Sequence, residues 1–149
     1  MIRVQREAFD TGAEIAAISE GRTDIGAIVS FTGLVRDFND GRPVTGLSLE
    51  HYPGMTEREL EKIEAEAQRR WELQASLIVH RYGDLALGDP IVLVITASPH
   101  REDAFDAARF LMDWLKTKAP FWKSEITPEG ETVWVSERKS DVDAASRWE

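Results

Sequence analysis

Lys116 stands where an amine could do chemistry. It lies eleven residues after Phe105 and four after Met112. At about 100° per residue it therefore falls within roughly 20° of Phe105, on an apolar helical face. The face also contains Ala108 and Leu115. An amine there either extends to water or is desolvated, and desolvation lowers the pKa of a lysine. Spacing alone leaves both alternatives open.

Lys123 is a second amine close to the first. It follows Pro120, the residue predicted to end the helix, so the chain must fold back near the helix end. Two neighbouring ammonium groups repel, and a lysine whose pKa is lowered can act as a nucleophile or an acid/base. The alternative is that these lysines only complement the negative C-terminal end of the helix. Lys118 points about 200° away from Lys116 and is interpreted as a surface residue.

Other cationic side chains could bind an anion. His100 and Arg101 fall in the first helical turn, where free N–H groups attract anions, or they simply face solvent. Arg36 ends a predicted strand before a polar loop, and Arg138 follows the last predicted strand. The remaining histidines end predicted strands and are interpreted as packing and hydrogen-bonding residues: His51 and His80.

Composition narrows the classes of function. The chain has 149 residues, a hydrophobic content of 42% and a charged content of 30%, which predicts a single domain over residues 1–149. The net charge of −9 argues against a general nucleic-acid binder. The absence of cysteine excludes a disulfide, a thiolate metal site and a cysteine nucleophile, and with 3 histidines we expect no metal and no cofactor. No signal-peptide core is visible, so we expect a cytoplasmic protein.

Hydrophobic patterning predicts the elements that position these residues. Strands are expected over residues 2–9, 25–35, 44–52, 75–82, 91–97, 121–127 and 132–137. Helices are expected over residues 12–19, from Thr56 to about Trp71, over 98–118 and in the tail 139–149. We expect the strand 25–35 to be central, with the strand 44–52 as its partner, and Gly33 indicates a bulge or a close approach of another group. The strand 91–97 is apolar throughout and should be buried on both faces.

Local signals set the expected ends of the helices. Asp10 should cap the first helix, and Thr56 with Glu59 forms a predicted capping box. Ser98 is the expected N-cap of the long helix, with Pro99 at its first position. In the last hairpin, one strand face carries Phe121, Lys123 and Glu125. The element order predicts an α+β fold: a mixed or antiparallel sheet with two main helices and a C-terminal β-hairpin.

Four stretches together resemble one family. They are FTGLVR (Phe31–Arg36), LEHYPGMTE (Leu49–Glu57), the pair His100-Arg101, and LKTKAPFWK (Leu115–Lys123). The chain is similar over nearly its whole length to the large, catalytic subunit of molybdopterin synthase, the MoaE family. The resemblance implies an α/β-hammerhead-like region with further antiparallel strands.

The resemblance also implies an activity and partners. Members of the family are sulfurtransferases in molybdenum cofactor biosynthesis. They convert cyclic pyranopterin monophosphate to the molybdopterin dithiolene. The sulfur arrives as a thiocarboxylate on the C-terminal Gly-Gly of a small ubiquitin-like subunit. A homodimer of large subunits forms the core of a heterotetramer.

The family's functional residues map onto this sequence by position. Lys116 and Lys123 match the catalytic lysines. The matched substrate-binding residues are Leu34, Val35, Arg36, His100, Arg101, Lys116, Lys123, Ser124, Glu125 and Arg138. Leu34 and Ser124 occupy positions that are often basic in the family, so a side-chain charge role is lost at both.

Two other functions are considered beside the sulfurtransferase. One is a non-catalytic module that binds a phosphorylated small molecule or an acidic C-terminal tail. The other is a metal-free hydrolase that uses His100, for which no nucleophile–base pair is found. In the sulfurtransferase interpretation, the two ends of the long helix lie about 25 Å apart. We therefore expect a site shared across a dimer, with His100 and Arg101 from one chain and Lys116 and Lys123 from the other.

Overall fold

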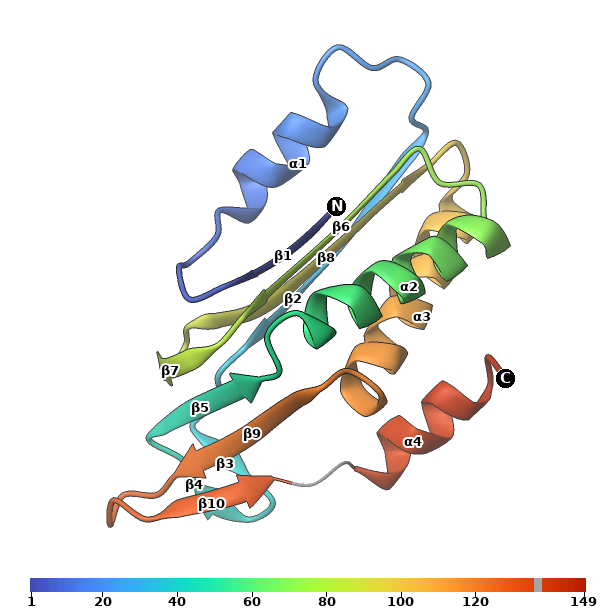
Figure 1. Cartoon of the computed structure of the whole chain (residues 1–149). Coiled ribbons are helices and arrows are strands. Elements are labelled where there is room, and N and C mark those ends of the chain that lie inside the picture. Colours follow the sequence, from blue (N-terminus) through green and yellow to red (C-terminus); the bar gives the residue numbers. More distant parts are fainter. Residues whose placement is uncertain (136–137) are drawn as a thin grey trace.

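The computed structural model describes residues 1–135 and 138–149 and has an α+β fold (Figure 1). Its helices are α1 (Thr11–Ser19), α2 (Met55–Arg70), α3 (Arg101–Thr117) and α4 (Lys139–Ser146). Its strands are β1 (Ile2–Gln5), β2 (Ala27–Leu34), β3 (Phe38–Asn39), β4 (Arg42–Pro43), β5 (Gly46–His51), β6 (Ala75–Arg81), β7 (Gly83–Ala86), β8 (Pro90–Ser98), β9 (Phe121–Ile126) and β10 (Thr132–Val135). In this part of the chain, no helix is long and apolar enough to cross a membrane.

The first sheet has the strand order β1-β6-β8-β2, with β1 parallel to β6 and the other pairs antiparallel. Burial of β8 on both faces is confirmed, because its side chains alternate between two cores. Val92 and Val94 pack in the cluster that includes residues of α2 and α3, whereas Leu93 and Ile95 pack towards residues of α1. Figure 1 shows α2 and α3 on one face of this sheet and α1 on the other.

The expected central position of residues 25–35 is wrong. β2 lies at the edge of the first sheet and pairs with β8. The expected partner, residues 44–52, instead forms β5 in a second sheet of order β10-β9-β5-β7. The bulge at Gly33 is confirmed by a register shift between Gly33 and Leu34.

The C-terminal hairpin is confirmed by antiparallel pairing of β9 and β10. Residues 136–137, the end of its predicted second arm, lie outside the described residues. A smaller hairpin, β3–β4, lies within the polar loop after β2. Its turn is Asp40-Gly41, with φ angles of 50° and 75°. The Asp-Gly pair suits this turn because both positions need positive φ.

Two of the three predicted caps are wrong. Asp10 caps α1 as expected, since its side chain accepts a hydrogen bond from the Ala13 N–H at 3.0 Å. At α2 the reciprocal acidic residue is Glu57, which accepts from the Gly54 N–H at 2.6 Å. The Thr56 hydroxyl donates instead to the Tyr52 carbonyl at 2.8 Å. The predicted Thr56–Glu59 box therefore lies two residues too late.

The predicted start of the long helix is wrong as well. Ser98 is the last residue of β8 and is fully buried, and the N-cap position is occupied by His100. The Ser98 hydroxyl still receives a hydrogen bond from the His100 N–H at 3.2 Å. Pro99 is therefore in the connection, and α3 begins at Arg101.

The apolar face of α3 differs from the predicted one at Phe105. That side chain is 61% exposed, whereas the helix packs against α2 and the sheet through Leu111 and Leu115. The other buried residues of α3 are Ala104, Ala107, Ala108 and Phe110. Small alanines on this face let the helix lie close to the strands, and the bulky Phe105 points away from them.

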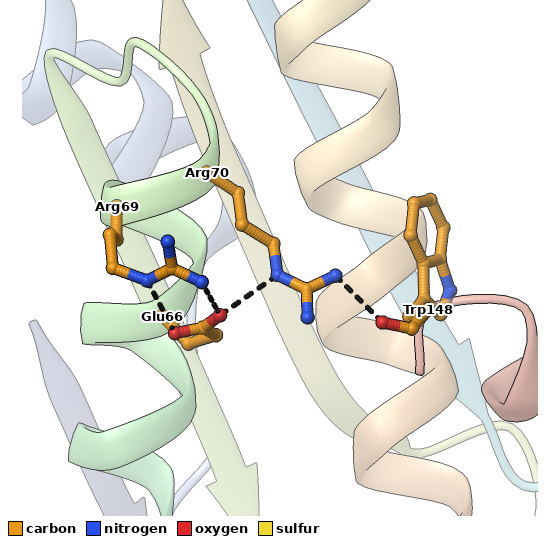
Figure 2. A network of polar contacts seen from close by, with 4 residues as sticks. All are labelled: Glu66, Arg69, Arg70 and Trp148. Atoms are coloured by element: carbon orange, nitrogen blue, oxygen red, sulfur yellow. Dashed lines mark hydrogen bonds and ion pairs between the residues drawn. The ribbon is translucent and has the colours of Figure 1, made fainter.

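The C-terminal segment is fastened to the helices by aromatic and ionic contacts. The Trp148 ring packs edge-on against Trp71 and Phe110, and its N–H donates to Asp113 at 2.7 Å. In Figure 2, Glu66 accepts from Arg70, which in turn donates to the Trp148 carbonyl at 3.0 Å. The last residues are also held near the C-terminal end of α3, where Lys118 pairs with Glu149 at 3.1 Å.

Candidate active site

A cavity of about 430 Å³ opens where the C-terminal end of α3 meets β2, β9 and the β3–β4 hairpin. Its volume falls in the range typical of small-molecule sites. Its lining is apolar in part, through residues such as Leu49, Ile91 and Leu115. Its charged lining residues are Arg36, Lys116, Lys123, Glu125, Arg138 and Asp141. Four cations and two carboxylates thus surround a partly apolar space.

The two lysines reach this cavity from different elements. Lys116 lies in the last turn of α3, and Lys123 lies in β9, after the chain reverses through Ala119 and Pro120. Along β9, the predicted shared face is confirmed, because Phe121, Lys123 and Glu125 all line the cavity. The helix end and the strand therefore present two amines to one space.

Desolvation falls on Lys123 rather than on Lys116. Lys116 is exposed, so the buried alternative for this amine is wrong. Burial lowers the pKa of Lys123 below its ordinary value, and the neighbouring Lys116 ammonium lowers the pKa further. Glu125 opposes this effect and Arg138 adds to it. Lys123 is therefore more easily deprotonated than an ordinary lysine.

Two arginines converge on one buried amide. Asn39 is 7% exposed, and its side-chain oxygen accepts from Arg36 at 3.5 Å and from Arg138. Arg138 also lies 3.9 Å from the Asp40 carboxylate. Two guanidinium groups at one oxygen form a concentrated positive charge beside the lysines, which suits a phosphate or carboxylate.

Glu125 supplies a negative charge within this cationic region. It is 7% exposed, and its Oε1 lies 3.8 Å from the Arg42 guanidinium. Among the described residues, that oxygen has no hydrogen-bond partner. A buried carboxylate oxygen in this state is available to a ligand donor.

Seven of the predicted site residues line the cavity. They are Leu34, Val35, Arg36, Lys116, Lys123, Glu125 and Arg138. His100, Arg101 and Ser124 do not line it. Ser124 is buried on the opposite face of β9, as strand alternation requires. His100 and Arg101 lie at the far end of α3, whose 17 residues span about 25 Å.

Comparisons with known proteins agree with this arrangement. The family model described as MoaE protein matches residues 4–118. The chain belongs to the MoaE family. It is 59% identical over 148 residues to a Pseudomonas aeruginosa protein named molybdopterin synthase catalytic subunit, covering 99% of this chain and 98% of that one.

Solved structures of MoaE proteins share the fold. The molybdopterin biosynthesis MoaE protein from Burkholderia ambifaria superposes with a TM-score of 0.83 at 51% identity, covering 99% of this chain and 97% of the other. A Helicobacter pylori structure superposes with a TM-score of 0.75 at 23% identity, over 92% of this chain and 91% of that chain. Its title describes a complex of subunits 1 and 2 of molybdopterin-converting factor. At that identity the similarity shows the fold alone.

Two lining residues of this MoaE chain were missed as site residues. Asn39 falls in the polar loop after Arg36, and nothing in the sequence indicates that its side chain accepts from two arginines. His80 was interpreted as a packing residue, and its ring does stack on Phe121, but it also lines the cavity. The sequence shows His80 as a polar residue at the end of an apolar strand. That pattern does not tell whether the side chain packs in the core or lines a cavity.

Proposed function

We propose that this chain is the catalytic subunit of a cytoplasmic molybdopterin synthase. In this proposal it transfers sulfur to cyclic pyranopterin monophosphate from the C-terminal thiocarboxylate of a small ubiquitin-like subunit. The observation that carries the proposal is the meeting of Lys116 and Lys123 in one cavity with Arg36 and Arg138. The family assignment and the names of the relatives support it.

The charges of the cavity suit both reactants. Arg36 and Arg138 bind the substrate phosphate, because guanidinium groups form paired charge-assisted hydrogen bonds with such anions. The thiocarboxylate tail enters beside the lysines, and its Gly-Gly end has no side chains to clash with a narrow entrance. A chain without cysteine needs sulfur from a carrier.

The lysines then act on the transfer itself. In each of two transfers, the thiocarboxylate sulfur supplies the electron pair for one new carbon–sulfur bond, and a carbon–oxygen bond at the same substrate carbon breaks. Water later separates that sulfur from the carrier carbonyl, leaving a carboxylate on the carrier. Lys116 stabilises negative charge or moves a proton at this carbonyl, and Lys123 holds the substrate and the developing negative charge. The lowered pKa of Lys123 also lets it exchange a proton near neutral pH more readily than an ordinary lysine.

The far end of α3 takes part through a second copy of the chain. His100 and Arg101 are exposed and lie about 25 Å from Lys116 along the helix. One small ligand cannot contact both ends of the same helix. We therefore propose that each site combines the lysines of one protomer with His100 and Arg101 of its partner, in a homodimer that forms the core of a heterotetramer.

The deciding experiment is reconstitution with a thiocarboxylated small subunit and cyclic pyranopterin monophosphate, followed by assay of the dithiolene product. Lys116→Ala should lower turnover by about 10²–10⁴-fold, the usual contribution of a positioned acid/base. Its affinity for the small subunit should change far less. Lys118→Ala is the matched control, since Lys118 lies outside the cavity and pairs with Glu149.

Three results would count against parts of this proposal. Full turnover in Lys116→Ala would remove the catalytic role of that amine. Loss of turnover in Lys118→Ala would point to general damage at the helix end. A wild-type chain that binds both partners without forming product would instead support the non-catalytic binding module.

A further inference from the structure

His80 lies at the wall of the cavity without a role in the proposed chemistry. It sits near the end of β6 and is 7% exposed. Its ring stacks on Phe121 with a centroid distance of 3.7 Å and an interplanar angle of 16°. Phe121 and Lys123 share a face of β9, so His80 lies on the same side of that strand as one of the two lysines.

The hydrogen bond at Nδ1 fixes the tautomer of His80. Nδ1 lies 2.8 Å from the main-chain oxygen of Arg81. A carbonyl oxygen can only accept, so Nδ1 must carry the proton. Burial lowers the pKa of His80 to about 4, and Lys116, His51 and Lys123 add to the lowering. The imidazole is therefore neutral near pH 7, and Nε2 holds an acceptor lone pair.

That lone pair is open to the cavity. Within the part of the chain that the structure describes, Nε2 has no hydrogen-bond partner. Among those residues, the side-chain nitrogen and oxygen atoms that are both fully buried and without a hydrogen-bond partner are Arg3 Nε, Gln74 Oε1 and Glu125 Oε1. His80 Nε2 has no partner but is not among them, so it is not fully buried, and His80 lines the cavity. The acceptor consequently faces the space where a ligand would lie.

A neutral acceptor is unusual in this cavity. The cations offer only donors: Arg36, Lys116, Lys123 and Arg138. The Asn39 oxygen already accepts from two of these arginines, whereas the Thr117 hydroxyl, which donates to the Asp113 carbonyl at 2.9 Å, keeps its lone pairs. A neutral N–H or O–H of a ligand can therefore find an uncharged aromatic acceptor at His80.

We propose that His80 is a substrate-binding residue whose Nε2 accepts a hydrogen bond from an N–H or O–H donor on a nitrogen heterocycle. The inference rests on the proposed function, in which the substrate is a pterin whose ring nitrogens carry such donors. The arginines recognise the phosphate, and His80 recognises the ring. A site built around such a bond discriminates against analogues that lack the donor, because its own acceptor is then left unpaired.

The test compares two ligands on the full-length chain by titration calorimetry. The ligands are cyclic pyranopterin monophosphate, which has the ring, and inorganic phosphate, which does not. His80→Phe keeps a flat ring against Phe121 but removes Nε2. We expect it to weaken binding of the pterin phosphate about tenfold, the usual effect of losing one buried hydrogen bond. Phosphate binding should stay within twofold.

A second pair of variants separates the two ring nitrogens. His80→Asn keeps a donor near the position of Nδ1 and loses the acceptor, so it should weaken pterin phosphate binding like His80→Phe. His80→Gln can place an amide oxygen near the position of Nε2 and should restore much of the affinity. His51→Phe is the matched control, since His51 also lies beside Phe121 but does not line the cavity.

Each other outcome overturns the inference. Unchanged pterin phosphate binding in His80→Phe, or equal binding by the Asn and Gln variants, shows that Nε2 does not contact the ring. Equal loss of both ligands shows a purely structural role. A wild-type chain that binds phosphate but no pterin phosphate overturns the proposed function, and this inference falls with it.

Discussion

At its C-terminal end α3 delivers Lys116 to the wall of a cavity, whereas at its N-terminal end it presents His100 and Arg101 to solvent. Both ends carry cationic side chains on one rigid helix. The difference comes from the neighbouring chain at each end. After Lys116 the chain reverses into β9 and returns with Lys123, whereas Arg101 follows the buried strand β8 after a short connection.

The N-terminal end is nevertheless firmly built. The Gly26 N–H donates to the Ser98 carbonyl at 3.0 Å, and the Ser98 hydroxyl accepts from the His100 N–H. This exposed histidine–arginine pair has no second element of the described chain that encloses it as the cavity encloses Lys116. In this fold, a charged side chain lines a cavity only where a second element encloses it, as β9 does beside Lys116.

The largest expected effect is at the enclosed end. Lys123→Met should lower turnover by about 10²–10⁴-fold, because it removes a cation from the reacting region. It should also raise the melting temperature at pH 7. The folded pKa of Lys123 is lowered by burial, so the unfolded chain holds this proton more tightly. The native state therefore carries a penalty below the folded pKa, and that penalty disappears as pH rises towards 10.5.

Thermal unfolding at pH 7 and pH 10 measures this penalty. The gap between the variant and the wild type should narrow at the higher pH, and for a chain of this size each kcal/mol moves Tm by roughly 2–4 °C. Lys118→Met, on an exposed lysine, should show no such gap. A lower Tm for Lys123→Met at pH 7 would mean that the amine is paired rather than desolvated.

The next prediction joins the two ends. A double variant, His100→Ala with Arg101→Ala, should lose most of its turnover if these residues complete the partner's site. Mixing it with Lys116→Ala after dissociation should restore activity to about one quarter of wild type. About half of the dimers are then mixed, and each mixed dimer has one intact site of its two. Activity that stays at the sum of the two variants would show that sites are not shared.

The sequence predicted the proximity of the two lysines better than the pairing of the strands. The reversal after Pro120 and the alternation of Phe121, Lys123 and Glu125 are local features, and they placed two lysines together correctly. The edge position of β2 and the pairing of β5 with β9 are long-range choices. Alternation shows which face of a strand is buried, but it does not show which other strand is its neighbour.

Errors on the helices have a similar cause. Helical spacing placed Phe105 on the buried face, yet the buried residues of α3 include Ala104, Leu111 and Leu115 and leave Phe105 exposed. Phe105 lies about 100° around the helix from Ala104, so the arc that meets the sheet, which distant elements determine, stops short of it. His80 and Asn39 were undervalued since their roles depend on side chains from distant elements.

A smaller effect is expected from the N-terminal end of α3. A Cβ at Gly26 would overlap the main-chain carbonyl oxygen of Pro99, and it would lie 2.9 Å from the carbonyl carbon. Main chain cannot yield as a side chain can, so Gly26→Ala should destabilise the fold by about 3 kcal/mol or more in urea unfolding. Gly12→Ala is the control.

At Gly12 the added methyl meets only the Asp10 carboxylate, at an ordinary 3.5 Å. Because Gly12 lies in α1, alanine there should be neutral or stabilising by up to about 1 kcal/mol. Equal stability of the two variants would contradict the rigid packing described for the N-terminal end of α3. That end would then be free to adjust to a ligand without a partner protomer.

The smallest effect concerns the neutral imidazole at the enclosed end. The pKa of His80 is about 4 in the folded chain, against 6.5 for the ordinary group. Above pH 6.5 both states leave the ring neutral, so its contribution to stability is complete. As pH falls from 6.5 towards 4, the unfolded chain takes up the proton and the folded chain does not, so stability is lost.

At about 1.4 kcal/mol per pKa unit, the wild type should lose about 2 kcal/mol more than His80→Phe between pH 7 and pH 5. Urea unfolding at both pH values measures this difference, and carboxylates that titrate in the same range cancel between the two chains. If His80→Phe instead loses as much stability as the wild type, the imidazole is not held neutral. Nε2 would then take up a proton nearer pH 6.5, the ordinary value, and the enclosure of the cavity end of α3 would not extend to the protonation of His80.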